Sequence, residues 1–473
     1  MYLSSALKKA GHEVYLLKTI YSDYEKYALG SQSVRDGEAL SSEDEILRFV
    51  EKVSPHILAY SVTTGMHGYY LKLNRMIRKN INAVSIFGGP HPTFFPEIIN
   101  DEYVDFICQG EGEEAFVELV NNLDSRVNVK QIRNLWHKNL GGVYKNDLRP
   151  LIKEIDDIDF PDRDLVYQYN SSRRNPIKNF ITGRGCPYDC SYCFNHSYSK
   201  LYSGKGQRVR IRSPKNVILE IAEIKKKYPL EIVYFQDDIF ILSKKWLEEF
   251  LCLYKNEIKL PYHCHLRVGL FDEKTLQSLK WSGCVSVTLA LESGNDYLRN
   301  KILKRNMNKK DIYASARLLH KYKISFRTEN ILGIPHENLK TSLETLFMNI
   351  RCRPAIGWAS LYQPYPKTEL GKLCQDEGLF NGDIDGIKPS FFEASILKLP
   401  QKKRIENLQK FFSIIVEFPF LLPFVFLLIQ LPPNLVFNLI YKKWKNYCYS
   451  NRLYKVKQKR EILNTQTVIN KEI

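Results

Sequence analysis

The chain has 473 residues, a formal net charge of +17, and a composition that is 44% hydrophobic and 26% charged. This length predicts two or three domains, and the composition is that of an ordinary globular protein. Ten cysteines in so long a chain exclude a secreted disulfide scaffold. The sequence begins on an amphipathic segment rather than a signal peptide, so we expect a cytoplasmic protein.

Residues 1–125 alternate between helical and strand patterns. This alternation predicts an α/β domain with a doubly wound, Rossmann-like parallel sheet. Helices are expected at Tyr2–Ala10, Glu43–Val53, Tyr69–Lys79 and Glu113–Asn121, and strands at His12–Leu17, His56–Val62, Ala83–Phe87 and Val104–Cys108. A domain of this kind normally begins with a central strand, whereas this sequence begins on the helix that would follow it.

Small and polar residues follow three of the expected strands. They are Ser61 and Thr63 after one strand, Gly88, Gly89, Pro90 and His91 after the next, and Gly110 and Gly112 after the third. Glycines let the backbone approach a ligand closely, and the hydroxyl groups offer hydrogen bonds. A plain turn is the alternative interpretation of each glycine pair.

Residues 126–175 have weak periodicity and several turn signals, and we interpret them as a connector with one hairpin. Strands and helices alternate again over residues 176–375. The expected strands are Asn179–Gly183, Ile232–Gln236, Tyr262–Arg267, Ser286–Leu291, Ser325–Leu332 and Ile356–Tyr362. Six strand–helix units predict a partial, open (β/α)6 barrel, in which chemistry takes place at the C-terminal ends of the strands.

Cys186, Cys190 and Cys193 form a C-x3-C-x2-C motif directly after the first barrel strand. Thiolates are the usual ligands of iron–sulfur clusters, and three of them leave one iron of a [4Fe–4S] cluster open to another ligand. The alternative is a zinc site, which needs a fourth ligand such as His196, although C-x3-C is uncommon zinc spacing. We interpret the other seven cysteines as small, mostly buried hydrophobic residues.

This motif resembles the signature of the radical S-adenosylmethionine (SAM) superfamily. The resemblance implies that the open iron chelates SAM, and that one-electron reduction cleaves SAM to methionine and a 5′-deoxyadenosyl radical. It also implies SAM-binding roles for Tyr192, Asp237, Asp238, Glu292, Asn330 and Gly333. For the acidic residues, helix or loop capping is the alternative. Arg267 is expected either to face a carboxylate or to form a surface salt bridge.

Residues 1–125 are similar to the cobalamin-binding domain that precedes many radical SAM modules. The resemblance implies that the loops after the strands bind cobalamin, through Ser61, Thr63, Gly88, Gly89, Pro90, His91, Gly110 and Gly112. A D-x-H-x-x-G motif is absent, so we expect no histidine ligand to cobalt and interpret His67 and His91 as loop residues. Without a first strand the pocket would be incomplete, as after a misplaced start or a gene truncation, and we then expect weak cobalamin binding.

Residues 376–473 are expected to form a helical extension. Phe418–Ile440 carries no charge but contains four prolines, and residues 401–460 hold twelve Lys and Arg against two Glu. Prolines disfavour one straight spanning helix, so we expect an interfacial or re-entrant hairpin at the inner face of a membrane. A buried helix pair or a dimer contact is the alternative. The basic residues lie beside this apolar run, so we expect no nucleic-acid partner.

These resemblances imply an anaerobic, cobalamin-dependent radical SAM enzyme that methylates an unactivated carbon. Its partners would be a one-electron reductant, such as ferredoxin or flavodoxin, and a small-molecule or lipid-like substrate. The alternative is a cyclisation, oxidation or rearrangement without methyl transfer. A cofactor-binding sensor without catalysis is disfavoured by the cysteine motif together with Asp237, Asp238 and Glu292.

Overall fold

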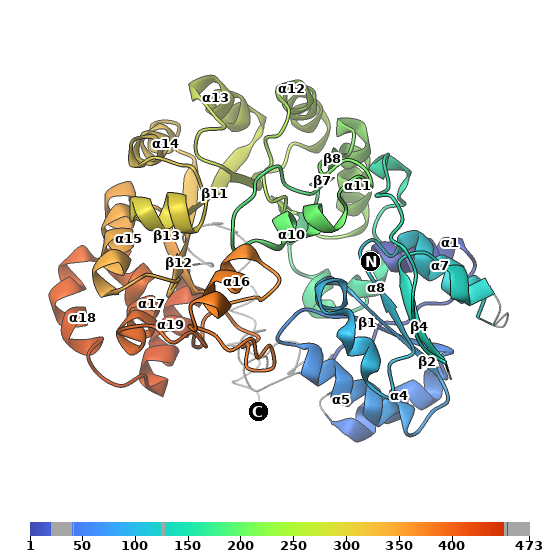
Figure 1. Cartoon of the computed structure of the whole chain (residues 1–473). Helices are drawn as coiled ribbons and strands as arrows, with labels where there is room; N and C mark the ends of the chain where they lie inside the picture. Colours follow the sequence, from blue (N-terminus) through green and yellow to red (C-terminus); the bar gives the residue numbers. More distant parts are fainter. Residues whose placement is uncertain (20–39, 41, 124–127, 140, 449–451, 453–473) are drawn as a thin grey trace, which may run out of the picture.

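The structure is a computed structural model that describes residues 1–19, 40, 42–123, 128–139, 141–448 and 452. An N-terminal α/β domain lies beside a curled, open barrel, and a group of C-terminal helices lies at the opposite end of the barrel (Figure 1). The α/β fold class and the helical C-terminal region agree with the sequence-based prediction.

The N-terminal sheet has five strands in the order β1-β2-β3-β4-β5. The first three strands are parallel, and β4 and β5 form an antiparallel hairpin on β3. The strands are β1 (Ile57–Ser61), β2 (Val84–Gly88), β3 (Phe106–Cys108), β4 (Leu135–Asn139) and β5 (Gly142–Lys145). The hairpin expected in residues 126–175 therefore extends this sheet.

The segment His12–Leu17 is not a strand, so this prediction was wrong. Its apolar residues are instead used for packing: Val14 contacts the cluster around Leu7 and Leu119, and Leu17 contacts the cluster around Ile46. A strand needs a partner for its backbone groups as well as alternating burial, and among the described residues before Glu43 the β-pairing is a single bridge, Thr19 to Leu40.

Helices cover both faces of the N-terminal sheet. They are α1 (Tyr2–Lys9), α4 (Glu43–Val53), α5 (His67–Arg78), α6 (Pro90–Phe94) and α7 (Glu113–Asn121), with 3-10 turns η1 (Pro96–Asn100) and η2 (Asn128–Gln131). α1 and α7 pack with Ile86 of β2, whereas α4 and α5 pack with Leu58 of β1. Ser42 begins α4 with a capping box to Glu45.

The barrel sheet has six parallel strands in the order β13-β12-β11-β10-β9-β6 and is open between its two edge strands. The strands are β6 (Ile177–Phe180), β9 (Ile232–Phe235), β10 (Tyr262–Leu266), β11 (Cys284–Glu292), β12 (Ser325–Leu332) and β13 (Ile356–Leu361). All six expected strands are present. β7 (Gly183–Arg184) and β8 (Arg210–Ile211) form a separate, short antiparallel pair, and the segment between them contains the cysteine motif and α10.

Alternating strand residues point to opposite sides of the barrel sheet. Val233, Cys264 and Leu289 lie in the main hydrophobic cluster with the outer helices, so Tyr234 and His265 face the inside. The helices of this region are α8 (Asp164–Tyr167), α9 (Asn170–Arg173), α10 (Phe194–Leu201), α11 (Pro214–Lys227), α12 (Lys244–Leu253), α13 (Glu273–Ser282), α14 (Lys309–Lys321), α15 (Leu339–Cys352) and α16 (Glu369–Asp376). There are also a 3-10 turn, η3 (Ile155–Asp157), and two π-helical turns, η4 (Tyr254–Ile258) and η5 (Leu298–Ile302).

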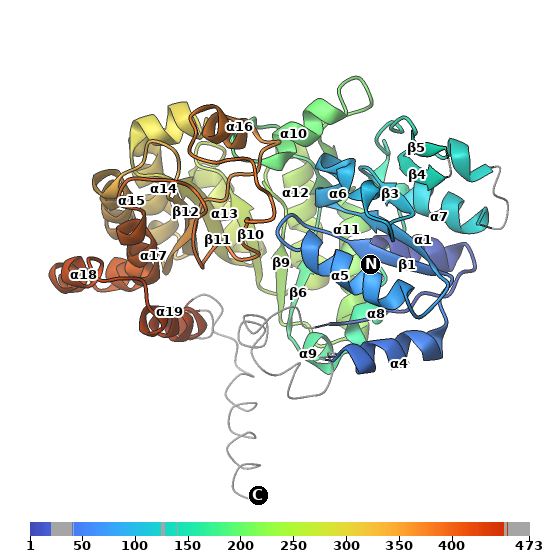
Figure 2. The same cartoon turned by 60° about the horizontal axis from the view of Figure 1, so that its bottom comes forward.

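The C-terminal region consists of α17 (Lys402–Glu417), η6 (Pro419–Leu421), α18 (Leu422–Leu428) and α19 (Leu435–Cys448). α17 packs on β13 and α15, and α19 packs on α17. Figure 2 shows α18 at the outer edge of the molecule with α19 beside it. Over the part of the chain that the structure describes, no helix is both long enough and apolar enough to cross a membrane.

Candidate active site

The three motif cysteines lie in the loop that leaves β6 and ends at α10, at the C-terminal mouth of the barrel. Cys190 is buried, and Cys186 and Cys193 are half-buried. Gly185 has a φ of 88°, and a Cβ there would lie 2.0 Å from the Arg208 carbonyl oxygen, so only glycine allows this close approach. Burial raises the pKa of the Cys186 thiol and raises that of Cys193 to about 12.

The donor chemistry of this loop fits an iron–sulfur cluster. It brings three thiols to one mouth of the barrel, and sulfur ligands are what such clusters require. In the described ranges, no group of three or more His, Cys, Asp or Glu is arranged to hold a single metal ion. His196, the fourth ligand of the zinc alternative, contacts Asp189 instead, with 2.7 Å between Nδ1 and Oδ1.

Asp237 anchors the start of the cysteine loop. Its Oδ1 accepts hydrogen bonds from the backbone and hydroxyl of Thr182, both at 2.8 Å, and from the Gly183 backbone at 2.9 Å. Its other oxygen, Oδ2, is buried and has no hydrogen-bond partner among the described residues. Burial raises the pKa of Asp237 to about 7. In the ionised form of Asp237, Oδ2 is therefore an unpartnered acceptor for a ligand at the barrel mouth.

Asp238 is exposed, unlike its neighbour, and lies beside the cysteine loop. It accepts a hydrogen bond of 2.7 Å from Asn195. After burial, its negative charge is among the causes that raise the pKa of Cys186 and Cys193. The adjacent carboxylates thus have different surroundings: Asp237 holds the loop, and Asp238 faces the thiols.

Buried Glu292 and Arg305 form a polar group with half-buried Tyr192 against Cys190. The Tyr192 hydroxyl donates to Glu292 Oε1 at 2.6 Å. Arg305 places Nη1 3.5 Å from Cys190 Sγ and donates from Nη2 to the Ala290 carbonyl at 2.7 Å. Glu292 lies at an irregularity in the β11–β12 pairing and has a φ of 67°, a backbone region that is strained for glutamate.

Sequence reasoning missed Arg305. It follows no strand directly and belongs to no motif, so the sequence carries no signal for it. Arg267, the residue expected to face a carboxylate or the surface, is buried; its guanidinium lies 3.7 Å from the centre of the Tyr188 ring and donates to the Arg305 carbonyl. The barrel mouth therefore holds two buried guanidinium groups.

Asn330 and Gly333 have different positions at the end of β12. The Asn330 side chain is turned toward α15, where it accepts a hydrogen bond of 2.9 Å from Asn349, and it donates to the Trp358 carbonyl at 2.7 Å. The Gly333 backbone donates to buried Glu337 at 2.5 Å. Asn330 thus links the end of β12 to α15, and Glu337 holds the turn at Gly333.

The predicted cobalamin loops lie at the C-terminal edge of the N-terminal sheet. Ser61, Thr63 and Pro90 are exposed, and Gly88 and Gly89 are half-buried. Gly89 has a φ of 92°, and a Cβ there would lie 3.0 Å from the Val62 nitrogen. This edge therefore offers hydroxyl groups and closely spaced backbone, which suits the polar tail of a large cofactor.

His91 and His67 are buried and stacked rather than free in a loop. Their ring centres are 4.2 Å apart, and His91 contacts the Thr64 hydroxyl at 3.1 Å. His67 Nε2 lies 2.7 Å from Oδ1 of Asp385, a residue beyond the barrel. Burial, followed by the charge of His67, lowers the pKa of His91 to about 3, so its ring is neutral.

Gly110 and Gly112 contact protein groups. A Cβ on Gly110, whose φ is 84°, would lie 1.8 Å from the Tyr202 hydroxyl oxygen, and one on Gly112 would lie 3.3 Å from Cys108 Sγ. Gly110 therefore lets the third loop of the N-terminal sheet pack on the end of α10.

The C-terminal edges of the two sheets face each other. Phe94 of α6 stacks on Phe194 of α10, with ring centres 4.6 Å apart. Arg184, in the cysteine loop, forms ion pairs with Glu111 at 2.9 Å and Glu113 at 2.6 Å. Arg210 of β8 adds a pair to Glu111 at 2.8 Å. These contacts place the predicted cobalamin loops next to the cysteine loop.

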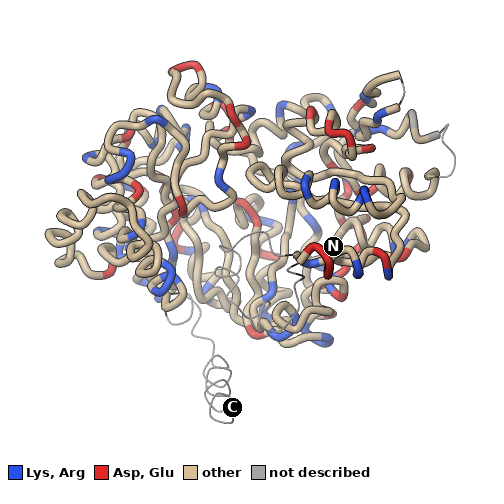
Figure 3. Tube along the Cα trace, turned by 90° about the horizontal axis from the view of Figure 1, so that it is seen from below, with Lys and Arg blue, Asp and Glu red and all other residues tan. Residues whose placement is uncertain are grey.

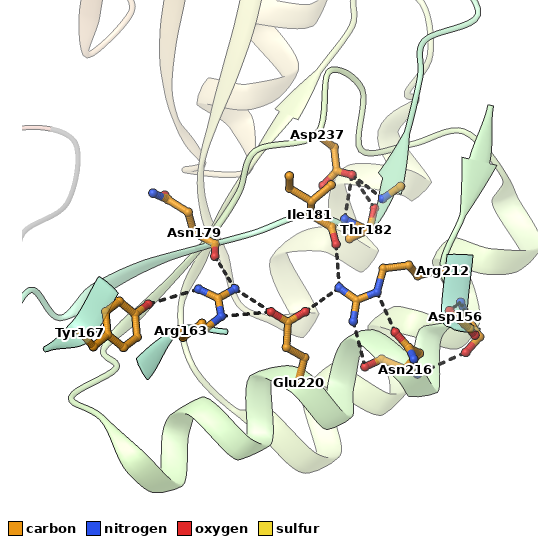
Figure 4. A network of polar contacts seen from close by, with 12 residues as sticks. Asp156, Arg163, Tyr167, Asn179, Ile181, Thr182, Arg212, Asn216, Glu220 and Asp237 are labelled. Atoms are coloured by element: carbon orange, nitrogen blue, oxygen red, sulfur yellow. Dashed lines mark hydrogen bonds and ion pairs between the residues drawn. The ribbon is translucent and has the colours of Figure 1, made fainter. Parts of the chain in front are cut away.

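A buried network of charges lies behind the first barrel strand (Figure 4). Glu220 of α11 accepts from Arg163 at 2.6 Å through Oε1 and from Arg212 at 2.5 Å through Oε2. The same arginines donate to the carbonyls of Asn179 at 2.8 Å and Ile181 at 2.9 Å. All three charged side chains are buried. The network therefore fixes the strand end from which the cysteine loop begins.

Comparison with known proteins agrees with this geometry. The family model of the radical SAM superfamily matches residues 180–348, and that of the B12 binding domain matches residues 1–120. An uncharacterised methyltransferase of Pyrococcus horikoshii is 30% identical over 331 residues, which cover 69% of this chain and 71% of that protein. The chain belongs to the radical SAM superfamily. It is a cobalamin-dependent radical SAM enzyme, and its cofactors are a [4Fe–4S] cluster, SAM and cobalamin.

Two further proteins resemble the chain. The anaerobic magnesium-protoporphyrin IX monomethyl ester cyclase of Cereibacter sphaeroides is 25% identical, with 80% of this chain and 60% of that protein covered. The methyltransferase TsrM of Kitasatospora setae, solved with tryptophan and a SAM analogue, superimposes with a TM-score of 0.63 at 17% identity. This match covers 80% of this chain and 72% of TsrM, and it shows a shared fold.

Arg305 gives a test of how the radical SAM site tunes its cluster. In the variant Arg305→Met, we expect the cluster to assemble but its reduction potential to fall, because a positive charge beside the Cys190 sulfur is lost. The measurement is a redox titration followed by electron paramagnetic resonance. Lys304→Met removes a neighbouring, more exposed charge and serves as control. Equal potentials for Arg305→Met and the wild type would contradict this role.

Proposed function

We propose that this radical SAM enzyme methylates an unactivated carbon of a small-molecule substrate. When bound, the cluster and SAM supply a radical that abstracts hydrogen, and cobalamin supplies a methyl group. The observation that carries the proposal is the contact between the two sheet edges, through Phe94 and Phe194 and through Glu111 and Arg184. Methyl transfer to a carbon radical needs the two cofactors close to one substrate, and this contact supports that arrangement. The similarity to a methyltransferase supports it further.

The residues of the cysteine loop would hold the cluster and SAM. Cys186, Cys190 and Cys193 would ligate three irons. Oδ2 of Asp237, which has no partner among the described residues, would accept from the SAM amino group, and Asp238 lies near the thiols. Tyr192 and Glu292, which are hydrogen-bonded to each other, would lie beside the adenosyl group of SAM. The turn at Gly333 would contact the adenine through its backbone.

The cobalamin tail would lie along the edge of the N-terminal sheet. Ser61 and Thr63 would offer hydroxyls, and Gly88, Gly89 and Pro90 would offer backbone contacts, because all five residues are exposed or half-buried at that edge. His91 would support this loop through its buried contacts with Thr64 and His67. Gly110 and Gly112 would position the neighbouring loop by close packing.

Polar side chains on the inner face of the barrel support a substrate with polar groups. The Tyr234 hydroxyl lies 3.0 Å from His265 Nε2, and Arg327 donates to Tyr234 at 3.3 Å and to Glu329 at 2.6 Å. Burial lowers the pKa of His265 to about 4, so this ring is neutral. Such a lining offers hydrogen bonds to a polar molecule and disfavours a hydrocarbon at the same depth.

Radical cyclisation or oxidation is the second candidate reaction, because a cyclase relative covers 80% of this chain. Methyl-deuterated SAM separates the two. The reconstituted enzyme is incubated with reductant, cobalamin, labelled SAM and a metabolite extract, and the Cys186→Ala variant serves as control. We expect a product that carries the deuterated methyl group and is absent from the control. A product without the label that has lost two hydrogens would contradict methylation.

Radical SAM enzymes need an external electron donor, and we propose ferredoxin or flavodoxin in the cytoplasm. We also propose that the enzyme is peripheral to the inner face of a membrane. This second proposal rests on the C-terminal helices and is independent of the reaction type.

A further inference from the structure

Residues 418–448, which contain η6, α18 and α19 and which we call the C-terminal hairpin, expose an unusual amount of apolar surface. Phe420, Leu427 and Leu435 are 71%, 72% and 80% exposed. We define the hairpin surface as these three together with Phe418, Phe424, Phe426, Leu428, Leu431, Val436, Leu439 and Ile440, all of which are exposed large hydrophobic residues. Contiguous apolar patches of this kind are rare on monomeric soluble proteins and mark sites of interaction.

α18 and α19 are apolar on two sides. One side is buried against the rest of the protein, and the other side is the hairpin surface. Val425, Ile429 and Phe437 pack into the cluster around Phe412 of α17. The Asn407 side chain donates to the Leu431 carbonyl at 2.7 Å and so fixes the turn between α18 and α19. A helix that only covers a protein core is polar on its outer face. The outer face here is apolar, so the core of this chain does not account for it.

Basic residues border the hairpin surface, and acidic ones are absent from its sequence. Residues 418–448 contain no Asp or Glu and three lysines, of which Lys443 is exposed. Lys402, Lys403 and Arg404 line an open cavity of about 500 Å³ together with Leu431 of the hairpin turn. In Figure 3 the far-left end, where α18 lies, is drawn in tan. An apolar surface with a basic border complements an anionic lipid surface.

We propose that the hairpin surface docks on an anionic lipid bilayer and inserts into one leaflet. α18 has 7 residues and α19 has 14, so at about 1.5 Å per residue neither spans a hydrocarbon core of about 30 Å. The hairpin therefore lies in the interface, with its apolar side chains among the acyl chains. Lys402, Lys403 and Arg404 then face lipid phosphates beside the inserted turn.

A second copy of this chain fits the surface less well than lipid. In a two-fold dimer the same patch meets itself, so the basic borders of the two copies would approach each other. The hairpin sequence carries no carboxylate to compensate these charges. Anionic phosphates supply the missing negative charge, which favours the bilayer as the occupant.

Vesicle flotation of the full chain tests the proposal. We expect the protein to float with vesicles of phosphatidylcholine and phosphatidylglycerol, and to stay bound in high salt because apolar insertion persists when charges are screened. The affinity of the triple variant Phe420→Ser, Leu427→Ser, Leu435→Ser for the vesicles should be at least about tenfold lower. A second variant, Lys402→Gln, Lys403→Gln, Arg404→Gln, should bind less at low salt only.

A control variant replaces three exposed apolar residues on the barrel helices, each more than half as exposed as the hairpin residues. Leu219, Trp281 and Phe347 are 57%, 53% and 50% exposed, and their triple serine variant should float like the wild type. Unchanged circular dichroism in all variants shows that they fold. Two results would overturn the proposal: full chain that stays at the bottom with anionic vesicles, or a dimer in sedimentation that the hairpin variant abolishes. Flotation needs no catalysis, so its failure leaves the proposed reaction standing.

Discussion

Replacing Cys186 by alanine is expected to abolish reductive cleavage of SAM. With two thiolates left, the loop cannot hold a four-iron cluster whose fourth iron alone is open to SAM. Iron and sulfide content after anaerobic reconstitution should fall, and 5′-deoxyadenosine should disappear in liquid chromatography and mass spectrometry.

Cys252 offers a matched control for this experiment. It is exposed on α12, so Cys252→Ala should keep the iron content and the 5′-deoxyadenosine yield of the wild type. Formation of 5′-deoxyadenosine by Cys186→Ala at the wild-type rate would refute the assignment of the cluster to this loop.

The second large effect is expected from Glu220→Gln in the buried network of Figure 4. Glutamine removes the charge that compensates Arg163 and Arg212, and breaking a buried ion pair by neutralising one partner costs about 3–5 kcal/mol. The free energy of unfolding, measured by urea denaturation, should fall by this amount. The cysteine loop should also lose order, because both arginines hold backbone carbonyls before it.

Two further variants separate charge compensation from a general effect of α11. Glu223 lies on the same helix and is exposed, so Glu223→Gln should leave the unfolding free energy within about 0.5 kcal/mol of the wild type. Replacing Arg163, Glu220 and Arg212 together by Met, Leu and Met should recover much of the loss, because no uncompensated charge remains buried. Equal destabilisation by both glutamine variants would contradict this account.

Most of the barrel could be predicted from sequence because its signals are local. Each expected strand, from Asn179–Gly183 to Ile356–Tyr362, lies within a few residues of an observed one, since apolar runs alternate with helical periods. The segment His12–Leu17 has the same local pattern but pairs with no strand in the part of the chain that the structure describes. Strand formation depends on distant residues, which a local pattern does not contain.

Site residues that belong to a motif with a defined spacing could be predicted from the sequence. Site residues that are brought together by tertiary contacts could not. The spacing of Cys186, Cys190 and Cys193 favours a cluster over a zinc site, because C-x3-C is uncommon zinc spacing. By contrast, Arg305 reaches Cys190 across 115 residues of sequence, and His67 reaches Asp385 across 318. The burial that separates Asp237 from its neighbour Asp238 also depends on packing, so the sequence alone suggested one role for both.

In the C-terminal hairpin, too, the local elements were predictable from sequence and the tertiary packing was not. Its apolar composition and prolines predicted short helices, and these are present as η6, α18 and α19. Which residues remain exposed depends on how α19 packs on α17, and composition does not determine that packing.

The most direct test of the central claim is SAM cleavage by the wild-type chain. The enzyme is reconstituted anaerobically with iron, sulfide and cobalamin, reduced, and given SAM, and 5′-deoxyadenosine and methionine are quantified with the Cys186→Ala variant in parallel. We predict that both products form with the wild type and that the variant forms neither. A wild-type preparation that holds a complete four-iron cluster and binds SAM, yet yields no 5′-deoxyadenosine, would contradict the claim.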